Sequence, residues 1–314
     1  MSAGFLRVTA LRALAAASGL AISASPAFAQ VQATYLHTLA GFGGPLKYDG
    51  VRVSVDQERE ETYVIYQNLV HIFNPSGMEV FTFGDGLRLG QILDVAVDGN
   101  GDILLLSYKD SRSTVTRCDF KGVPIGPMEI RNLPAGLRFG ATRMVHRNGL
   151  LYFASLGSSS VIVTDANGEF RSHVEFLPLL EEDEKKKDGV ESIGFTVDRE
   201  GNIFLTMPVL FAVYKFSPDG KLTSFGRPGS APGRFGVVAG IASDSRGNLF
   251  VADKLKSVVM VFDKDFNFLT EFGYRGSKPA NLVVPDDIAI DKRDRVYVSQ
   301  ARRRGVSVFG LAFP

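Results

Sequence analysis

The chain has 314 residues, 45% of them apolar, which is enough to bury one large core or two small ones. Its 35 basic and 34 acidic residues nearly cancel, so the chain lacks the long-range field that draws a protein to nucleic acid or to an anionic membrane. The combination of 24 Phe, 9 Tyr, 33 Gly and 14 Pro favours strands joined by tight loops.

The first 29 residues have the features of a cleaved signal peptide. Arg7 and Arg12 form a positive start, residues 13–22 form an apolar run, and residues 27–29 (Ala-Phe-Ala) form a cleavage site. The apolar run is shorter than the ~20 residues that a membrane-spanning helix needs, which disfavours the alternative of an uncleaved anchor. The sequence therefore predicts export to the periplasm or the cell exterior, with residues 30–314 as the mature domain.

Six segments of the mature chain repeat one pattern about every 47 residues: an apolar run, an Asp, a short polar turn and a second apolar run. The first run suits a buried inner strand, and an Asp followed by Gly and Asn suits a tight hairpin. The segments are 51–66, 93–107, 143–155, 193–207, 240–254 and 287–300. The Asp position is filled by Asp56, Asp98, His146, Asp198, Asp244 and Asp291, where His146 assumes a one-residue deletion.

Two further short strands follow the hairpin in the units before the last, so a full unit has the four strands of a propeller blade. The sequence therefore predicts an all-β fold, a six-bladed β-propeller with four antiparallel strands per blade. The last unit ends too early to contain its own fourth strand. We expect an N-terminal strand at residues 35–40 to supply it, because closing the ring removes two exposed sheet edges.

The fifth unit, residues 226–273, resembles the NHL-repeat family in its Gly-Pro connector, its Asp, its Gly-Asn turn and its Val-Ala-Asp and Val-Phe-Asp motifs. The resemblance covers roughly residues 34–310 and implies an NHL-type propeller domain. It implies little about function, because one fold hosts unrelated activities. Similar propellers include peptide-amidating lyases, streptogramin lyases and gluconolactonase-like hydrolases, which hold a divalent metal at the channel, and others bind protein or RNA on a loop face.

The mouth of the central channel is expected at the start of each inner strand, four positions before the Asp of the repeat. By this count its ring consists of Arg52, Asp94, Thr142, Gly194, Gly240 and Asp287, with Asp286 beside it. We expect Arg52 to bind Asp94 and Asp287 in a neutral cluster, since these three lie on consecutive blades. The alternative is a Ca²⁺ or Mg²⁺ site on Asp94, Asp286 and Asp287, which the positive charge of Arg52 opposes.

Two surface segments are candidates for binding a partner. The loops after the second strands of the last two blades carry basic side chains. Together with Lys109, Arg112 and Arg117, these side chains are expected to form one basic patch. The binding residues predicted from these two loops are Lys254, Lys256, Arg302, Arg303 and Arg304. The second candidate is an insertion at residues 176–192, which is interpreted as a solvated loop, a short helix with i,i+4 ion pairs, or a docking loop.

The residue types of a catalytic centre are sparse. The four His are expected in different units and at different strand depths, and no Ser-His-Asp order with a nucleophile elbow is present. We therefore expect a non-catalytic scaffold without a cofactor that binds a protein in the cell envelope, and the basic patch favours an acidic protein or an acidic polysaccharide as its partner. The alternative is a lyase or lactonase-type hydrolase that uses Ca²⁺ or Mg²⁺ at the channel. A third hypothesis is a glycan or small-ligand binder that uses Tyr66 and Tyr108.

Overall fold

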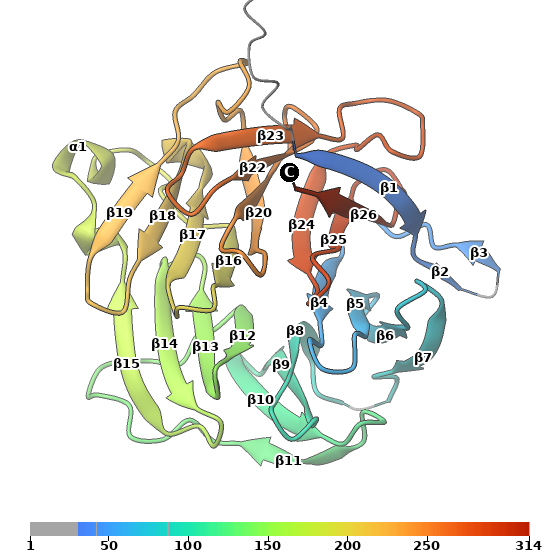
Figure 1. The fold of residues 1–314 in the computed structure, drawn as a ribbon. Helices are drawn as coiled ribbons and strands as arrows, with labels where there is room; N and C mark the ends of the chain where they lie inside the picture. Colours follow the sequence, from blue (N-terminus) through green and yellow to red (C-terminus); the bar gives the residue numbers. More distant parts are fainter. Residues whose placement is uncertain (1–30, 42, 87, 314) are drawn as a thin grey trace, which may run out of the picture.

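The computed structural model describes residues 31–41, 43–86 and 88–313. Six four-stranded antiparallel sheets follow one another around a central axis (Figure 1), which confirms the predicted six-bladed propeller. The segment interpreted as a signal peptide lies outside the described residues. In the described part of the chain no helix is long and apolar enough to cross a membrane.

Blades 1 to 3 follow the chain in order, with the innermost strand first. Blade 1 consists of β4 (Arg52–Val55), β5 (Thr62–Tyr66), β6 (Leu69–Phe73) and β7 (Glu79–Phe83). Blade 2 consists of β8 (Gln91–Val97), β9 (Ile103–Lys109), β10 (Arg112–Cys118) and β11 (Pro124–Met128). Blade 3 consists of β12 (Arg143–Arg147), β13 (Leu150–Ser155), β14 (Ser160–Asp165) and β15 (Phe170–Glu175).

The remaining blades have the same order. Blade 4 consists of β16 (Gly194–Val197), β17 (Ile203–Met207), β18 (Ala212–Phe216) and β19 (Leu222–Phe225), and the short helices η1 (Leu177–Leu179), α1 (Glu182–Lys185) and η2 (Pro208–Leu210) adjoin it. Blade 5 consists of β20 (Val238–Ser243), β21 (Leu249–Asp253), β22 (Val258–Phe262) and β23 (Phe268–Phe272). Blade 6 consists of β24 (Pro285–Ile290), β25 (Val296–Gln300), β26 (Val306–Ala312) and β1 (Gln32–Thr38), and β2 (Ala40–Gly41) pairs with β3 (Gly44–Pro45) beside it.

The ring is closed by the N-terminal strand, as predicted. Strand β1 pairs antiparallel with β26, from Gln32 opposite Ala312 to Thr38 opposite Ser307, and the two ribbons lie side by side in Figure 1. The strand begins three residues before the predicted segment 35–40 and ends at Thr38. The difference arises because Ala40 has already turned into β2, where its backbone N–H donates to the carbonyl of Gly77.

In five of the six blades, the Asp of the repeat holds the turn between the first two strands. In blade 2, the Asp98 Oδ1 atom accepts hydrogen bonds from the backbone N–H groups of Asn100 and Asp102. The equivalent Asp56, Asp198, Asp244 and Asp291 bond their own turns in the same manner and are all buried. A buried carboxylate that accepts several backbone N–H groups fixes a turn that would otherwise leave those donors unpaired.

Blade 3 departs from the predicted alignment. The backbone N–H of Met144 donates to Asp94 of the preceding blade, just as the N–H of Val53 donates to Asp287. Counting from these equivalent residues places Arg147, and not His146, at the Asp position. The cause is the shorter hairpin of this blade, in which Arg147 pairs with Leu150 across a two-residue turn. Asn-Gly is the sequence that such a tight turn favours.

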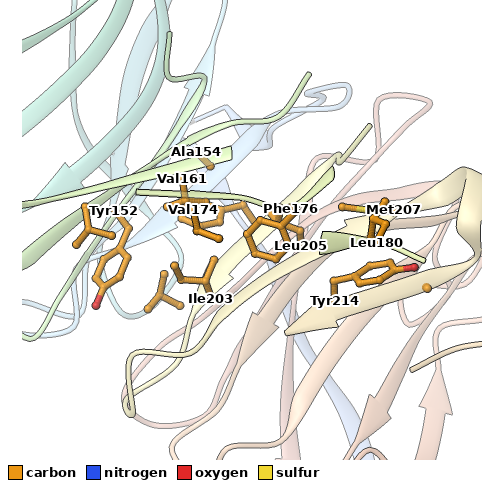
Figure 2. Close-up of a cluster of buried hydrophobic side chains, with 14 of the residues drawn as sticks. Tyr152, Ala154, Val161, Val174, Phe176, Leu180, Ile203, Leu205, Met207 and Tyr214 are labelled. Carbon is orange, nitrogen blue, oxygen red and sulfur yellow. The ribbon is translucent and has the colours of Figure 1, made fainter. Parts of the chain in front are cut away.

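The hydrophobic core lies between neighbouring blades rather than in one central layer. Between blades 3 and 4, side chains of β13, β14 and β15 face those of β17 and β18 (Figure 2). Phe176 and Leu180 of the insertion belong to this cluster and are buried. The insertion is therefore anchored at its start, and its helix α1 carries i,i+3 ion pairs in place of the expected i,i+4 pairs.

Candidate functional site

The starts of the inner strands converge on the channel mouth, where Arg52 bridges two blades. Its Nε lies 2.9 Å from Asp94 Oδ1 and its Nη2 lies 3.2 Å from Asp94 Oδ2. On the other side, its Nη1 lies 2.8 Å from both carboxylate oxygens of Asp287. The structure thus brings together the three residues that the repeat count placed on consecutive blades.

The electrostatics of this cluster favour a charged Arg52. Burial by itself lowers the pKa of Arg52, but the charges of Asp287 and Asp94 and their hydrogen bonds outweigh burial and raise that pKa. Asp94 is fully buried and accepts four donors, two from Arg52 and one each from the backbone of Val95 and Met144. Since a carboxylate offers about four lone-pair sites, Asp94 is saturated.

A second arginine, Arg143, occupies the same ring. It precedes Met144 as Arg52 precedes Val53, so it takes the ring position that sequence counting gave to Thr142. The Thr142 hydroxyl donates within its own blade to the carbonyl of Ala154, 3.3 Å away. Sequence reasoning missed Arg143 because it assigned a single deletion to blade 3. The Asn-Gly pair at 148–149 was the signal that could have corrected the count.

The two glycines of the ring allow neighbouring blades to approach closely. A Cβ atom on Gly240 would lie 2.7 Å from the carbonyl oxygen of Asp286 and 2.7 Å from the Cα of Asp287. A Cβ atom on Gly194 would collide with the carbonyl oxygen of Ala239. The ring therefore contains two arginines, two aspartates and two glycines, in the order Asp287, Arg52, Asp94, Arg143, Gly194 and Gly240.

Asp286 lies apart from the Arg52 cluster. Its Oδ1 atom is 2.6 Å from the Nζ of Lys254, which extends from the loop after β21. All three carboxylates of the predicted metal alternative thus have basic partners, Arg52 for Asp94 and Asp287, and Lys254 for Asp286. Within residues 31–41, 43–86 and 88–313, no group of three or more His, Cys, Asp or Glu side chains is arranged to hold a metal ion.

The loops after the second strands lie on the mouth face, because each second strand runs antiparallel to the inner strand beside it. In these loops Lys256 and Arg304 have structural roles. Lys256 Nζ lies 3.0 Å from Glu271 Oε2 and donates to the carbonyls of Ala231 and Arg234. Arg304 donates to three carbonyls of the connector between blades 5 and 6. Arg302 and Arg303 are exposed.

A larger basic surface surrounds these loops. We define the basic sector as residues 226–237, 254–257, 273–284 and 301–305, which together form the mouth face of blades 5 and 6. These segments contain nine Lys and Arg residues and no Asp or Glu. The four that sequence reasoning did not include, all from the connectors between blades, are Arg227, Arg234, Arg275 and Lys278. Among the residues that the structure describes, the only acidic partners of the sector are Asp286 and Glu271.

Three basic residues that were grouped with this patch lie elsewhere. Arg117 forms ion pairs with Asp98 and Asp102 at the opposite face of the propeller, so its inclusion was wrong. Lys109 and Arg112 flank the turn between β9 and β10, on the mouth face of blade 2. Since blade 1 separates blade 2 from blade 6, these two side chains are not part of the basic sector.

The channel is hollow below the Arg52 cluster. A cavity of about 320 Å³ extends from Arg52 toward the turns of the opposite face, with Ser54, His146, Arg147 and Thr196 among its lining residues. Arg147 donates from Nε to the carbonyl of Val197, 3.3 Å away. The cavity walls mix polar side chains with apolar ones contributed by the inner strands.

The four histidines and Cys118 lie on five different strands. His71 lies 2.7 Å from Glu79 within blade 1, and His37 lies in β1. His146 and His173 share blade 3, which corrects the expectation of four different units, but they lie on its innermost and outermost strands. Burial, assisted by the charge of Asp119, raises the pKa of the Cys118 thiol to about 11, so it is protonated at neutral pH.

No protein-family model matches the chain, and no curated protein matches its sequence. The fold resembles that of a gluconolactonase from Xanthomonas campestris, with 15% identity, TM-score 0.58 and 90% of each chain covered. An auxiliary nutrient binding protein from Bacteroides ovatus has 14% identity and TM-score 0.60, covering 91% of this chain and 78% of that one. Virginiamycin B lyase from Staphylococcus aureus has 10% identity and TM-score 0.59, covering 90% of this chain and 100% of that one.

These similarities define the chain as a six-bladed β-propeller. Its structural neighbours include both binding proteins and enzymes of the lyase and lactonase types. At such low identity the likeness extends to the fold alone, and the NHL-repeat resemblance is not established as family membership.

Proposed function

We propose that the chain is an exported, non-catalytic binding propeller whose basic sector takes an acidic protein partner of the cell envelope. The observation that carries this proposal is the charge of the sector: nine cations and no anion in four loop segments of a chain whose total charge is nearly balanced. A local field of one sign steers a partner of opposite charge and fixes its orientation.

The exposed side chains of the sector suit a protein partner. Arg227, Arg275, Lys278, Arg302 and Arg303 are all exposed. Two apolar side chains stand among them, Leu255 with 72% of its surface exposed and Tyr274 with 54%. Protein interfaces are enriched in Arg and Tyr and bury apolar groups at their centres, so the sector supplies both the charge and the contact area.

Export supports the choice of partner. The positive, apolar and small-residue features of residues 1–29 are those of a signal peptide. An exported propeller does not meet cytosolic RNA, which leaves acidic protein or polysaccharide as the partner of a basic loop face, and the exposed Leu255 and Tyr274 favour the protein.

The test reverses the charge of exposed side chains of the basic sector and keeps the side chains that have structural roles. Replacing Arg275, Arg302 and Arg303 by Glu leaves the structural contacts of Lys256 and Arg304 in place. Each exposed pair contributes ~0.2–1 kcal/mol, so the loss of three pairs should weaken binding of the partner roughly 3- to 150-fold. The measurement is a pull-down from an envelope extract at low and high salt, followed by affinity measurement on the captured protein.

The matched control replaces Lys121, Arg199 and Lys221 by Glu. These residues are also exposed, lie in turns of the opposite face and change the total charge equally. The control should retain the partner. Identical partners and affinities for all three proteins at both salt concentrations would refute the proposed binding surface.

The competing hypothesis is a lyase or lactonase-type hydrolase with Ca²⁺ or Mg²⁺ at the channel mouth. It has in its favour the carboxylates of the channel mouth, Asp94, Asp286 and Asp287, and structural neighbours named as such enzymes. A metal there would have to displace Arg52 or Lys254 from its carboxylate.

Asp286→Asn separates these hypotheses, because its side chain is 40% exposed and the Arg52 cluster does not use it. For a non-catalytic scaffold, elemental analysis of the purified mature protein should detect Ca²⁺ and Mg²⁺ well below one ion per chain, unchanged by the substitution. One bound ion per chain that Asp286→Asn removes would favour the enzyme.

A further inference from the structure

We propose that the channel mouth binds a carboxylate group through the guanidinium of Arg143. This site is formed by the inner strands and does not depend on the basic sector. It would accept the carboxylate of a small organic acid or of an acidic side chain that reaches into the channel.

The hydrogen-bonding capacity of Arg143 is largely unused. A guanidinium has five N–H donors, and within the part of the chain that the structure describes the side chain of Arg143 makes one hydrogen bond, from Nη1 to the carbonyl of Thr142 at 2.9 Å. Among the described residues, no Asp or Glu oxygen comes within ion-pair distance of Arg143. The Nε and Nη2 atoms of Arg143 have no hydrogen-bond partner among the described residues, but they are not fully buried. These donors therefore reach solvent.

The neighbouring carboxylates are already committed to other donors. Asp94 is saturated by Arg52 and two backbone N–H groups. Asp287 receives the Nη1 of Arg52 on both oxygens and the N–H of Val53. Asp286 is held by Lys254. Arg143 therefore lies beside three carboxylates and is paired with none of them.

Arg143 is partly exposed at the channel mouth. It does not line the cavity below that cluster, and among the groups acting on it is Asp286, which contacts the loop after β21. Burial lowers the pKa of Arg143, and the positive charge of Arg52 adds to this effect. An arginine stays charged at neutral pH despite such a lowered pKa. Arg143 is therefore a partly buried cation that a bound anion would stabilise.

The charges around Arg143 favour a carboxylate over a phosphate. The two arginines and two aspartates of the ring cancel, and Lys254 cancels Asp286. Against this balance a bound carboxylate adds one negative charge beside three carboxylates, whereas a doubly charged phosphate adds two, so the carboxylate is repelled less. The planar carboxylate also matches the two parallel N–H groups of a guanidinium.

The experiment follows the arginine side-chain N–H resonances of the ¹⁵N-labelled mature protein during titration. The probes are sodium acetate, inorganic phosphate and a deca-glutamate peptide, each against sodium chloride at equal ionic strength. We expect acetate to shift the Arg143 resonance saturably and chloride to leave it unchanged. Losing hydrogen bonds to a charged group should make Arg143→Lys bind acetate roughly 10- to 100-fold more weakly, with Arg143→Gln weaker still.

The remaining outcomes decide the source of the carboxylate and the proposal itself. Saturation by the peptide at lower concentration than acetate assigns the site to an acidic polypeptide, and the reverse assigns it to a small acid. Acetate binding should persist in the Arg275, Arg302 and Arg303 triple variant, so failure of the basic sector leaves this site intact. Phosphate binding without acetate binding would overturn the proposal, and so would equal acetate affinity in the wild type and in Arg143→Lys. The Arg143→Lys variant keeps the positive charge, so it still tests the proposal if Arg143→Gln does not fold.

Discussion

Arg52 and Arg143 occupy equivalent positions in two blades but have different environments. Arg52 lies between the aspartates of blades 6 and 2 and uses both, whereas the blade that follows Arg143 contributes Gly194 to the ring. Asp94 joins three blades, because its carboxylate binds Arg52, its own strand and the N–H of Met144. Removing Asp94 would leave Arg52 with Asp287 as its one acidic partner among the described residues and would leave the buried N–H of Met144 without its acceptor, which is the costly way to break a buried cluster.

Gly240 provides the residue-scale prediction. Gly240→Ala would place a Cβ against the backbone of Asp286 and Asp287, which cannot rotate away as a side chain could. We expect a loss of roughly 1–3 kcal/mol in the free energy of unfolding, measured by denaturant titration. Gly157→Ala is the control, since nothing lies within 4 Å of its added Cβ. Equal stability of the two variants would show that the close approach of blades 5 and 6 is not required.

At the scale of elements, the hairpins are local but the outer strands are not. Each inner hairpin is held by its own turn, as Asp244 shows by bonding the N–H groups of Arg246 and Asn248. By contrast, β1 meets β26 from the far end of the chain, and Tyr35 packs edge-on against Phe309 with ring centres 5.9 Å apart. Closure therefore depends on a contact that forms only when both ends are present.

Deleting residues 30–38 should remove β1 and expose the edge of β26. We expect an insoluble protein or a broad unfolding transition at lower temperature, because an unpaired edge strand aggregates and the sixth blade loses its outer strand. Thermal unfolding and sedimentation of the purified protein check this. A truncation that removes only residues 30 and 31 is the control. A deletion protein that unfolds like the control would contradict a stabilising role for closure.

At the scale of the whole molecule, a nearly neutral chain separates its charges by position. The mouth face of blades 5 and 6 is basic, while the insertion before blade 4 carries Glu181, Glu182, Asp183 and Glu184 in succession. Glu184 accepts a hydrogen bond from the Tyr214 hydroxyl at 2.5 Å, so this acidic segment is held against blade 4. The propeller thus presents opposite charges from a rigid scaffold, which favours one orientation of a charged partner.

The fold was largely predictable from the sequence because its determinants are periodic and local. The repeat, the alternating strands and the Asp turns each act over a few residues, and the missing fourth strand of blade 6 pointed to the N-terminus. The prediction of β1 was displaced by three residues, since the pairing register depends on β26 and not on the segment itself. In blade 3 the Asp position was assigned to His146 instead of Arg147, because the shorter turn of this blade shifts its alignment with the other repeats.

By itself the sequence determined the blades, their number, the closure of the ring and the meeting of Arg52 with Asp94 and Asp287. Only the tertiary structure decided which charges are free. Lys256 and Arg304 resemble surface cations in the sequence but are bound to Glu271 and to backbone carbonyls of neighbouring connectors. Among the residues that the structure describes, Arg143 has no acidic partner, because Asp94 is already filled by groups from three blades. The partners of a charge are set by which distant segments converge on it, and that convergence exists only in the folded ring.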